Sequence, residues 1–437
     1  MEYQKKYGLP TAIAMVVGSV IGSGVFFKTE SLINVAEGNA LTGLAAWGIG
    51  GACMLFCLLT FVSVTKYCNG EKSMVDISEN LVGKTYSYYI GWFMATVYYP
   101  ALVGVLSWLT AHYSLLFLGV DAVGDGLCML LASVCIVAFF MQNALFPRFF
   151  GKLQIATTFL KLIPLFLMII FGMMRGIDSK ILSENMLSST DIQKRTLFPA
   201  ISSVLFAYEG WIATLSLGND LKNREKNLPL ALMLGGITVT VVYILYYCGV
   251  MGSVPADVFL NYGQNGIKIA FETVFGKYAS RLLILFVAIS CMGALSAMTF
   301  SSGKAIHTLS KRQANSFFKI FSDETSSFMA GLTLSVLWLF IFFGTALSDE
   351  PLFGNFGFDI SEVPVITVYL MYIPIFVMFL KKYRNCLSKT IKVNVIFGII
   401  SCVFIAVSAF YAHSKDLLDY MMMWSGIMLA GEIVRKK

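Results

Sequence analysis

Apolar stretches of about 20 residues recur along the whole chain, and this repetition limits the possible folds more than any other feature. Each stretch is long enough to cross a hydrocarbon core of roughly 30 Å as a helix. The sequence therefore predicts an all-α membrane protein with 12 transmembrane helices. The predicted spans are residues 9–34, 40–65, 86–118, 124–146, 150–174, 197–218, 228–252, 279–302, 328–347, 360–380, 393–412 and 416–434.

The composition agrees with a lipid environment and argues against binding to nucleic acid. Hydrophobic residues make up 57% of the chain and charged residues only 13%, more apolar surface than a soluble domain can bury. With both termini in the cytoplasm, most of the 32 Lys and Arg residues fall on the cytoplasmic side, as the positive-inside rule requires. The net charge of +7 then reflects membrane orientation. We expect a multi-pass protein of the plasma (cell) membrane with cytoplasmic termini.

Two of the predicted spans are interrupted near their middles by residues that weaken helices. The first contains Gly22-Ser23-Gly24, and the sixth contains the segment 203–211, Ser-Val-Leu-Phe-Ala-Tyr-Glu-Gly-Trp. Each of these spans opens a series of five. Matching interruptions in two halves are typical of transporters with inverted repeats and broken helices. We expect one membrane domain over residues 1–437, with repeats at 9–174 and 197–380 and two additional helices at 393–434.

The interruptions also suggest what such a site binds. A broken helix in lipid leaves amide and carbonyl groups without partners, which is tolerated only where a ligand, water or other protein groups satisfy them. Freed amides at a helix N-terminus favour a carboxylate, and freed carbonyls favour an ammonium. A zwitterionic amino acid carries both groups. The alternative for Gly22-Ser23-Gly24 alone is close packing between helices through small residues.

Four further residues are candidates for the same site. Lys161 lies in an apolar span, where charge is costly and usually functional, although a lysine can also extend to the interface. Glu209 lies in the second interruption and could face a substrate ammonium, a cationic substrate side chain, Lys161 or a water-filled cavity. Ser290 is in the middle of the eighth span and could accept a hydrogen bond from Lys161, or bond its own backbone. Tyr243 is a candidate on the seventh span, where packing is the alternative.

Motifs for catalysis, cofactors and metals are not found. The chain has no HExxH, GxSxG or P-loop sequence, so we expect no enzyme activity and a transport process driven by gradients. The nine cysteines and three histidines show no metal-ligand spacing, and no metal or cofactor is expected.

The motifs resemble those of the amino acid–polyamine–organocation superfamily, and within it the L-type amino acid transporter branch and bacterial serine/threonine exchangers. The resemblance rests on Gly-Ser-Val-Ile-Gly-Ser-Gly-Val-Phe at 18–26, Leu-Lys-Leu-Ile-Pro at 160–164 and Leu-Phe-Ala-Tyr-Glu-Gly-Trp at 205–211. It implies a LeuT-like fold with a 5+5 inverted repeat and broken helices 1 and 6. Since the loop at 118–124 has no cysteine for bonding an ancillary subunit, we expect no such subunit.

The resemblance also implies roles for individual residues. The amides of Gly22, Ser23 and Gly24 would hold the substrate carboxylate, and nearby carbonyls would hold the ammonium. Lys161 would replace a sodium ion with Ser290 as its partner, Tyr243 would line the route from the cytoplasm, and Phe206 would act as an aromatic gate. The expected substrate-binding residues are Val20, Ile21, Gly22, Ser23, Gly24, Phe206, Ala207, Tyr208 and Glu209.

These observations predict a secondary amino acid transporter, specifically a sodium-independent exchanger of neutral amino acids that works by alternating access. Two alternatives remain open at this point. One is a transporter of cationic amino acids in which Glu209 faces the substrate side chain. The other is a non-transporting membrane receptor that binds amino acids.

Overall fold

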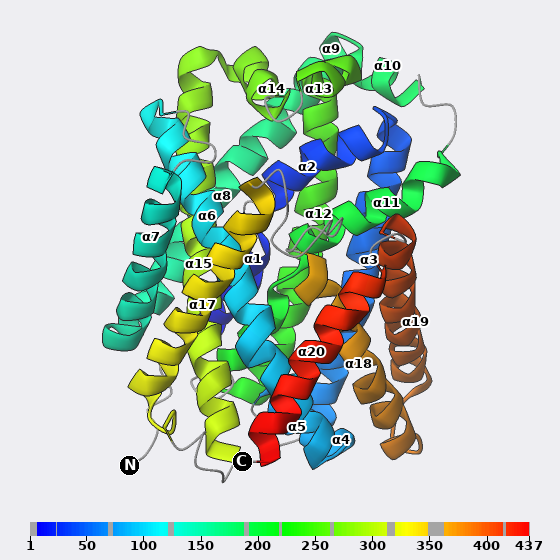
Figure 1. The fold of residues 1–437 in the computed structure, drawn as a ribbon. Helices are drawn as coiled ribbons and strands as arrows, with labels where there is room; N and C mark the ends of the chain where they lie inside the picture. The colour runs from blue at the N-terminus through cyan, green and yellow to red at the C-terminus, as the bar shows by residue number, and fades with distance from the viewer. Residues whose placement is uncertain are drawn as a thin grey trace.

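The computed structural model describes residues 7–22, 24–68, 73–120, 126–187, 192–217, 221–262, 266–312, 320–347, 362–413 and 417–436. These residues are almost entirely helical, as the sequence predicts (Figure 1). The elements in chain order are α1 (Leu9–Val20), α2 (Gly24–Val35), α3 (Ala40–Tyr67), α4 (Met74–Leu81), α5 (Lys84–Phe93), η1 (Met94–Tyr98), α6 (Tyr99–Leu118), α7 (Gly126–Leu145), α8 (Pro147–Leu167), η2 (Met168–Gly172), α9 (Met173–Asp178), α10 (Ile181–Leu187), α11 (Lys194–Leu205), η3 (Phe206–Tyr208), η4 (Trp211–Leu217), α12 (Arg224–Ser253), α13 (Ala256–Tyr262), α14 (Gly266–Phe275), α15 (Lys277–Arg312), α17 (Glu324–Leu347), α18 (Glu362–Lys382), α19 (Lys389–Ala412) and α20 (Leu417–Lys436).

Eleven helical segments among the described residues are long and apolar enough to cross a membrane. They correspond in order to the first eleven predicted spans. The twelfth prediction, 416–434, coincides with the 20-residue helix α20, which is not among those eleven. α15 continues beyond the predicted end of the eighth span at residue 302, to Arg312.

The connections between spans contain short helices that the span prediction does not include. α4 lies at one end of the bundle, and α10, α13 and α14 lie at the other, where α9 continues the fifth span to Asp178 (Figure 1). The segment 175–196, predicted as a loop, contains the end of α9 and all of α10. An amphipathic segment at a bundle end can pair its backbone groups in a helix without being long enough to cross lipid.

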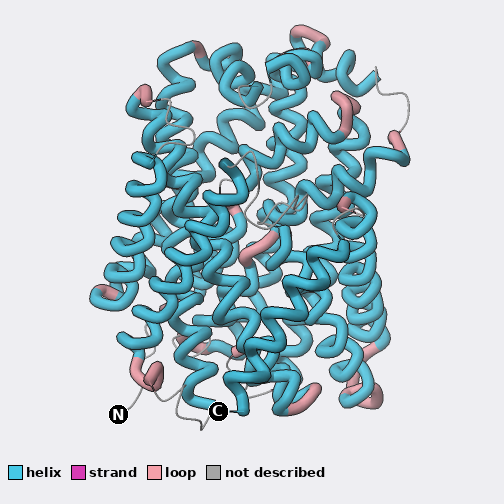
Figure 2. The backbone as a smooth tube through the Cα atoms, viewed as in Figure 1, coloured by secondary structure: helices cyan, strands magenta, loops and turns pink. Residues whose placement is uncertain are grey.

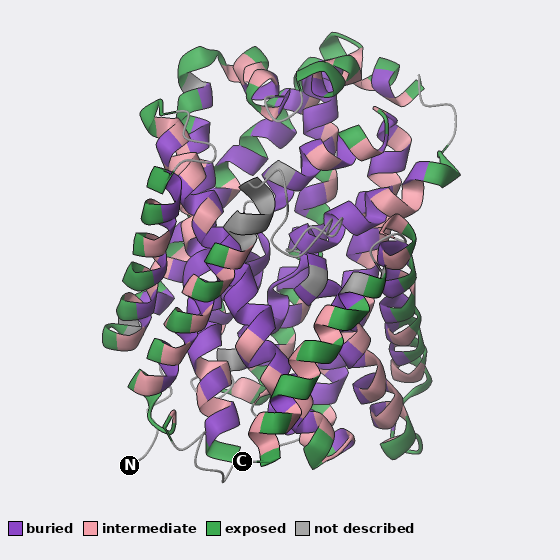
Figure 3. Ribbon diagram, in the orientation of Figure 1, coloured by how far each residue is buried: buried purple, intermediate pink, exposed green. Residues whose placement is uncertain are grey.

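The most buried spans are the two that the sequence predicts to be broken. In the most apolar 18-residue windows of the first and sixth spans 82% and 83% of the residues are buried, compared with 33% in the corresponding window of α7. Figure 3 shows the buried residues gathered in the middle of the bundle and exposed residues on the outer faces of peripheral helices. The exposed side chains of α7 and α8 are largely apolar, which suits contact with lipid. The irregular segments therefore lie inside protein, where backbone outside helices is tolerated.

Candidate functional site

Both predicted interruptions are real breaks in the helices. α1 ends at Val20, Ile21 leaves helical geometry at φ −73° and ψ 90°, and a new helix, α2, begins at Gly24. In the sixth span α11 gives way to one 3₁₀ turn, Glu209 is extended at φ −87° and ψ 165°, and Gly210 has φ +106°. Figure 2 shows short non-helical segments at mid-height among the helices. Ser23 lies outside the described residues.

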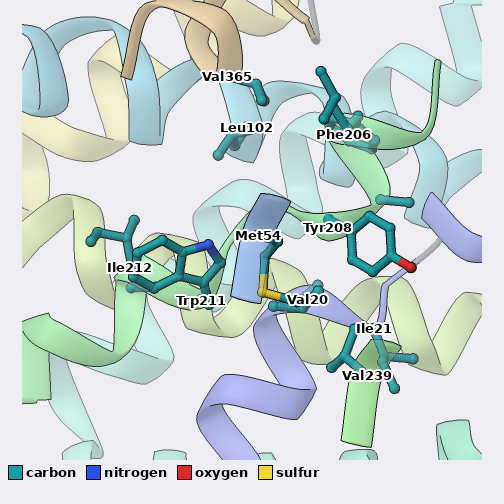
Figure 4. Close-up of a cluster of buried hydrophobic side chains, with 14 of the residues drawn as sticks. Val20, Ile21, Met54, Leu102, Phe206, Tyr208, Trp211, Ile212, Val239 and Val365 are labelled. Carbon is teal, nitrogen blue, oxygen red and sulfur yellow. The ribbon is translucent and has the colours of Figure 1, made fainter. Parts of the chain in front are cut away.

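The two breaks cross each other at close range. A Cβ atom on Gly24 would lie 2.9 Å from the Cα atom of Ala207. A Cβ atom on Gly210 would lie 2.6 Å from the carbonyl oxygen of Ser19. Glycine is thus required at both positions because backbone packs directly against backbone. The freed groups of both breaks are consequently concentrated in one place, and Figure 4 shows side chains from both segments gathered there.

Lys161 lies beside the first break and is fully buried, so it does not extend to the membrane interface. Its Nζ donates hydrogen bonds of 2.7 Å to the carbonyl oxygens of Gly18 and Ile21. The Gly18 carbonyl belongs to the last turn of α1 and the Ile21 carbonyl to the residue after it, where helical partners are missing. The ammonium therefore supplies donors and positive charge at the negative end of the α1 dipole.

Ser290 and Tyr243 also bond the freed carbonyls, in arrangements that the sequence does not predict. The Ser290 hydroxyl donates to the Ile21 carbonyl at 3.4 Å, and so shares this acceptor with Lys161. The Tyr243 hydroxyl lies 3.0 Å from the carbonyl oxygens of both Val20 and Ala207. Tyr243 therefore bridges the two breaks. Its role in lining the route from the cytoplasm stays a prediction.

A small cavity lies between the breaks and the neighbouring helices α6 and α15. Polar edges of the cavity come from both broken segments, and its other walls are apolar. Phe206 and Glu209 line it, whereas Tyr208 turns away and donates a 2.8 Å hydrogen bond to the Trp47 carbonyl. The lining residues are Ser19, Val20, Gly22, Gly24, Leu102, Leu106, Phe206, Glu209, Gly210, Ala294 and Met298.

Glu209 is the charged residue of this lining. Its Oε1 accepts a hydrogen bond from the Tyr98 hydroxyl, which reaches it from η1. Its Oε2 is buried and has no hydrogen-bond partner among the described residues. A buried carboxylate oxygen without a partner is costly, so this oxygen is a natural acceptor for a bound donor.

A second polar group, the Glu362 cluster, consists of Lys28, Ser202, Glu362 and His413. The Glu362 carboxylate lies 3.6 Å from Lys28 Nζ and 2.9 Å from His413 Nε2, and it accepts a 3.3 Å hydrogen bond from Ser202. Lys28 also lies 5.6 Å from the centre of the Phe206 ring. The cluster joins α2, α11, α18 and the residue that caps the C-terminus of α19, next to the aromatic side chain that lines the cavity. The sequence analysis does not predict this cluster. Lys28 and Glu362 each lie within an apolar predicted span, where a charged residue is usually functional, and this could have indicated it.

The sequence of this chain is similar to those of known amino acid transporters. The amino acid permease family model matches residues 7–431. The serine/threonine exchanger SteT of Bacillus subtilis is 26% identical over 427 residues, covering 98% of this chain and 94% of SteT. The b(0,+)-type amino acid transporter 1 of Mus musculus is 26% identical and the human cystine/glutamate transporter 22% identical, over 70% and 71% of this chain and 62% of each relative.

A solved structure gives the same overall architecture. MhsT, determined in complex with L-phenylalanine, superimposes with a TM-score of 0.58 at 15% sequence identity. The match covers 94% of this chain and 100% of MhsT, and it agrees with the predicted LeuT-like fold. Since the family model also matches nearly the whole chain, this protein belongs to the amino acid permease family.

Proposed function

We propose that this protein is a secondary transporter that exchanges neutral amino acids across the cell membrane without sodium. The observation that carries this proposal is the crossing of two broken helices at a cavity, with Lys161 bound to the carbonyl end of α1. The family membership and the transport functions named for SteT and the b(0,+)-type relative support it.

In the proposed complex the backbone of the substrate is bound by backbone of the protein. The carboxylate would bind the amides at Gly22, Ser23 and Gly24, at the positive end of the α2 dipole. The ammonium would face Glu209 Oε2 and the carbonyls of the two breaks, including that of Phe206. Because Tyr243 now bonds the Val20 and Ala207 carbonyls, we expect its hydroxyl to rearrange when an ammonium binds.

The side chain of the substrate would face an apolar wall, which favours a neutral amino acid. Leu102, Leu106, Ala294 and Met298 form that wall. A charged side chain placed there would lose its hydration without gaining a matched partner. The Phe206 ring and the Glu362 cluster would close the cavity on one side.

We further propose that both termini are cytoplasmic, so that the end of the bundle with α13 and α14 faces outward. α2 and α11 then form the outer half of the site. The two inverted repeats comprise residues 9–174 and 197–380. Exchange requires that the loaded carrier reorients much faster than the empty one. We expect the chain to work without an ancillary subunit.

Counterflow in proteoliposomes containing only the purified chain tests this function. Vesicles loaded with unlabelled serine or alanine should accumulate the labelled amino acid from outside, with potassium or sodium as the external cation. A competition panel of the twenty amino acids then defines the side chains that are carried. Saturable binding without any flux would reject transport and favour a receptor.

Glu209→Gln should weaken the exchange of all neutral substrates by about tenfold through KM. The substitution replaces a hydrogen bond to a charged acceptor by one to a neutral group, a difference of about 1–1.5 kcal/mol. KM is measured by counterflow, with Glu184→Gln on the exposed surface of α10 as the control. Selective loss of arginine uptake instead would mean that Glu209 faces a cationic substrate side chain.

A further inference from the structure

The strongest unexplained group outside the candidate site is Glu30 on α2. Its side chain is only 7% exposed although it lies within the first predicted span. Its Oε1 is buried and has no hydrogen-bond partner among the described residues. Ionisable groups at such positions are costly and usually functional, so Glu30 requires an explanation.

Glu30 faces α12. The Phe26 ring packs edge-on against the Tyr246 ring of α12, with centroids 5.5 Å apart. Glu30 follows Phe26 by four residues, and residues with this spacing share one face of a helix. The Tyr246 hydroxyl is also buried without a partner among the described residues.

No positive charge compensates Glu30 within the described part of the chain. Lys28, the nearest lysine in sequence, forms its ion pair with Glu362. Among the described residues, no charged side chain on the helices packed against α2 forms an ion pair with Glu30. These side chains are exposed or half-buried, and they are Lys66 on α3, Lys194 and Arg195 on α11, Arg224, Glu225 and Lys226 on α12, Asp257 on α13, and Lys268 and Glu272 on α14.

We propose that Glu30 is a proton-binding site and that it must be protonated for the outer half of the transporter to close. A carboxylate and one phenol hydroxyl are too few ligands for a sodium ion, which needs a fuller oxygen shell, whereas a proton needs one lone pair. A protonated Glu30 can also donate to a neighbouring hydroxyl. Burial of the ionised form would cost several kcal/mol, so closure favours the acid.

This proposal rests on the transport function proposed above and assigns a second ligand to it. A proton would enter with each amino acid that is occluded from outside. At alkaline external pH the open form would keep Glu30 ionised, and closure would slow down. At pH values above the pKa of the Glu30 carboxyl in the open form, the protonated fraction falls about tenfold per pH unit. The exchange rate should fall in parallel.

The test measures counterflow of labelled serine in proteoliposomes with internal pH fixed and external pH varied from about 5 to about 8. Wild-type influx should fall by at least about tenfold at the alkaline end. Glu30→Gln, whose amide resembles the protonated acid, should make influx independent of external pH. Asp257→Asn, an exposed change on the neighbouring helix α13, should keep the wild-type profile.

Three results would overturn the proposal. The first is a wild-type influx that does not depend on external pH, and the second is a Glu30→Gln variant that keeps the wild-type profile. Stimulation by external sodium that Glu30→Gln removes would identify a metal-cation site instead and would also overturn it. Absence of counterflow at every pH would reject the transport function itself, so the two failures are distinguishable.

Discussion

Lys161→Ala should reduce amino acid exchange by at least about 100-fold while the protein still inserts into the membrane. The Lys161 ammonium donates two hydrogen bonds of 2.7 Å to the carbonyls that end α1. Hydrogen bonds to charged groups contribute about 1.5–3 kcal/mol each, so the loss of two is worth at least about 3 kcal/mol. Without them the end of α1 has unpaired carbonyls in a dry interior, and the first break cannot keep its geometry.

The measurement is counterflow of labelled serine, normalised to the amount of protein in the vesicles. Lys152→Ala is the matched control, because Lys152 is an exposed lysine on the same helix, α8. If Lys161 stands in for a sodium ion, added sodium should partly restore the alanine variant, with Gly18, Ile21 and Ser290 offering oxygen ligands. Exchange at the wild-type level in Lys161→Ala without sodium would rule out the coupling role.

The broken helices and the buried lysine could be predicted because each is indicated by a few adjacent residues. Such residues are energetically costly inside an apolar span unless they have partners. Three helix-weakening residues in an apolar span, such as Gly22-Ser23-Gly24, have few explanations in lipid. The same reasoning applies to Lys161, since burial of a charge in an apolar span demands partners nearby. The structure places its ammonium on the Gly18 and Ile21 carbonyls at the first break.

The remaining contacts depend on packing between segments that are far apart in the sequence. Tyr98 donates to Glu209 across 111 residues, and Lys28 pairs with a glutamate more than 300 positions away. Nothing in a single sequence identifies which of the 20 tyrosines reaches a given carboxylate. Tyr208 shows the same limit, because its position in the second break suggested a substrate contact whereas its hydroxyl bonds the Trp47 carbonyl.

Gly210→Ala is expected to have the second large effect, because two independent constraints exclude a side chain there. The backbone of Gly210 has φ +106°, a conformation that residues with a Cβ rarely adopt. Its Cβ would also lie 2.6 Å from the Ser19 carbonyl oxygen and 2.8 Å from Met298 Cε. The methionine can move, but the carbonyl belongs to the backbone of the crossing helix α1. Strain and overpacking together should cost roughly 2–4 kcal/mol.

The expected result is a lower Tm in detergent and a loss of exchange of more than about tenfold, since the second break can no longer cross the first at this distance. Gly48→Ala is the matched control: Gly48 lies inside α3 with no atom within 4 Å of an added Cβ. Alanine is favoured over glycine in a helix by roughly 0.5–1 kcal/mol, so this control should be neutral or slightly stabilising. If Gly210→Ala matched the control in both Tm and exchange rate, the two breaks would not be in backbone contact. The polar groups of the breaks would then not bound the cavity as described.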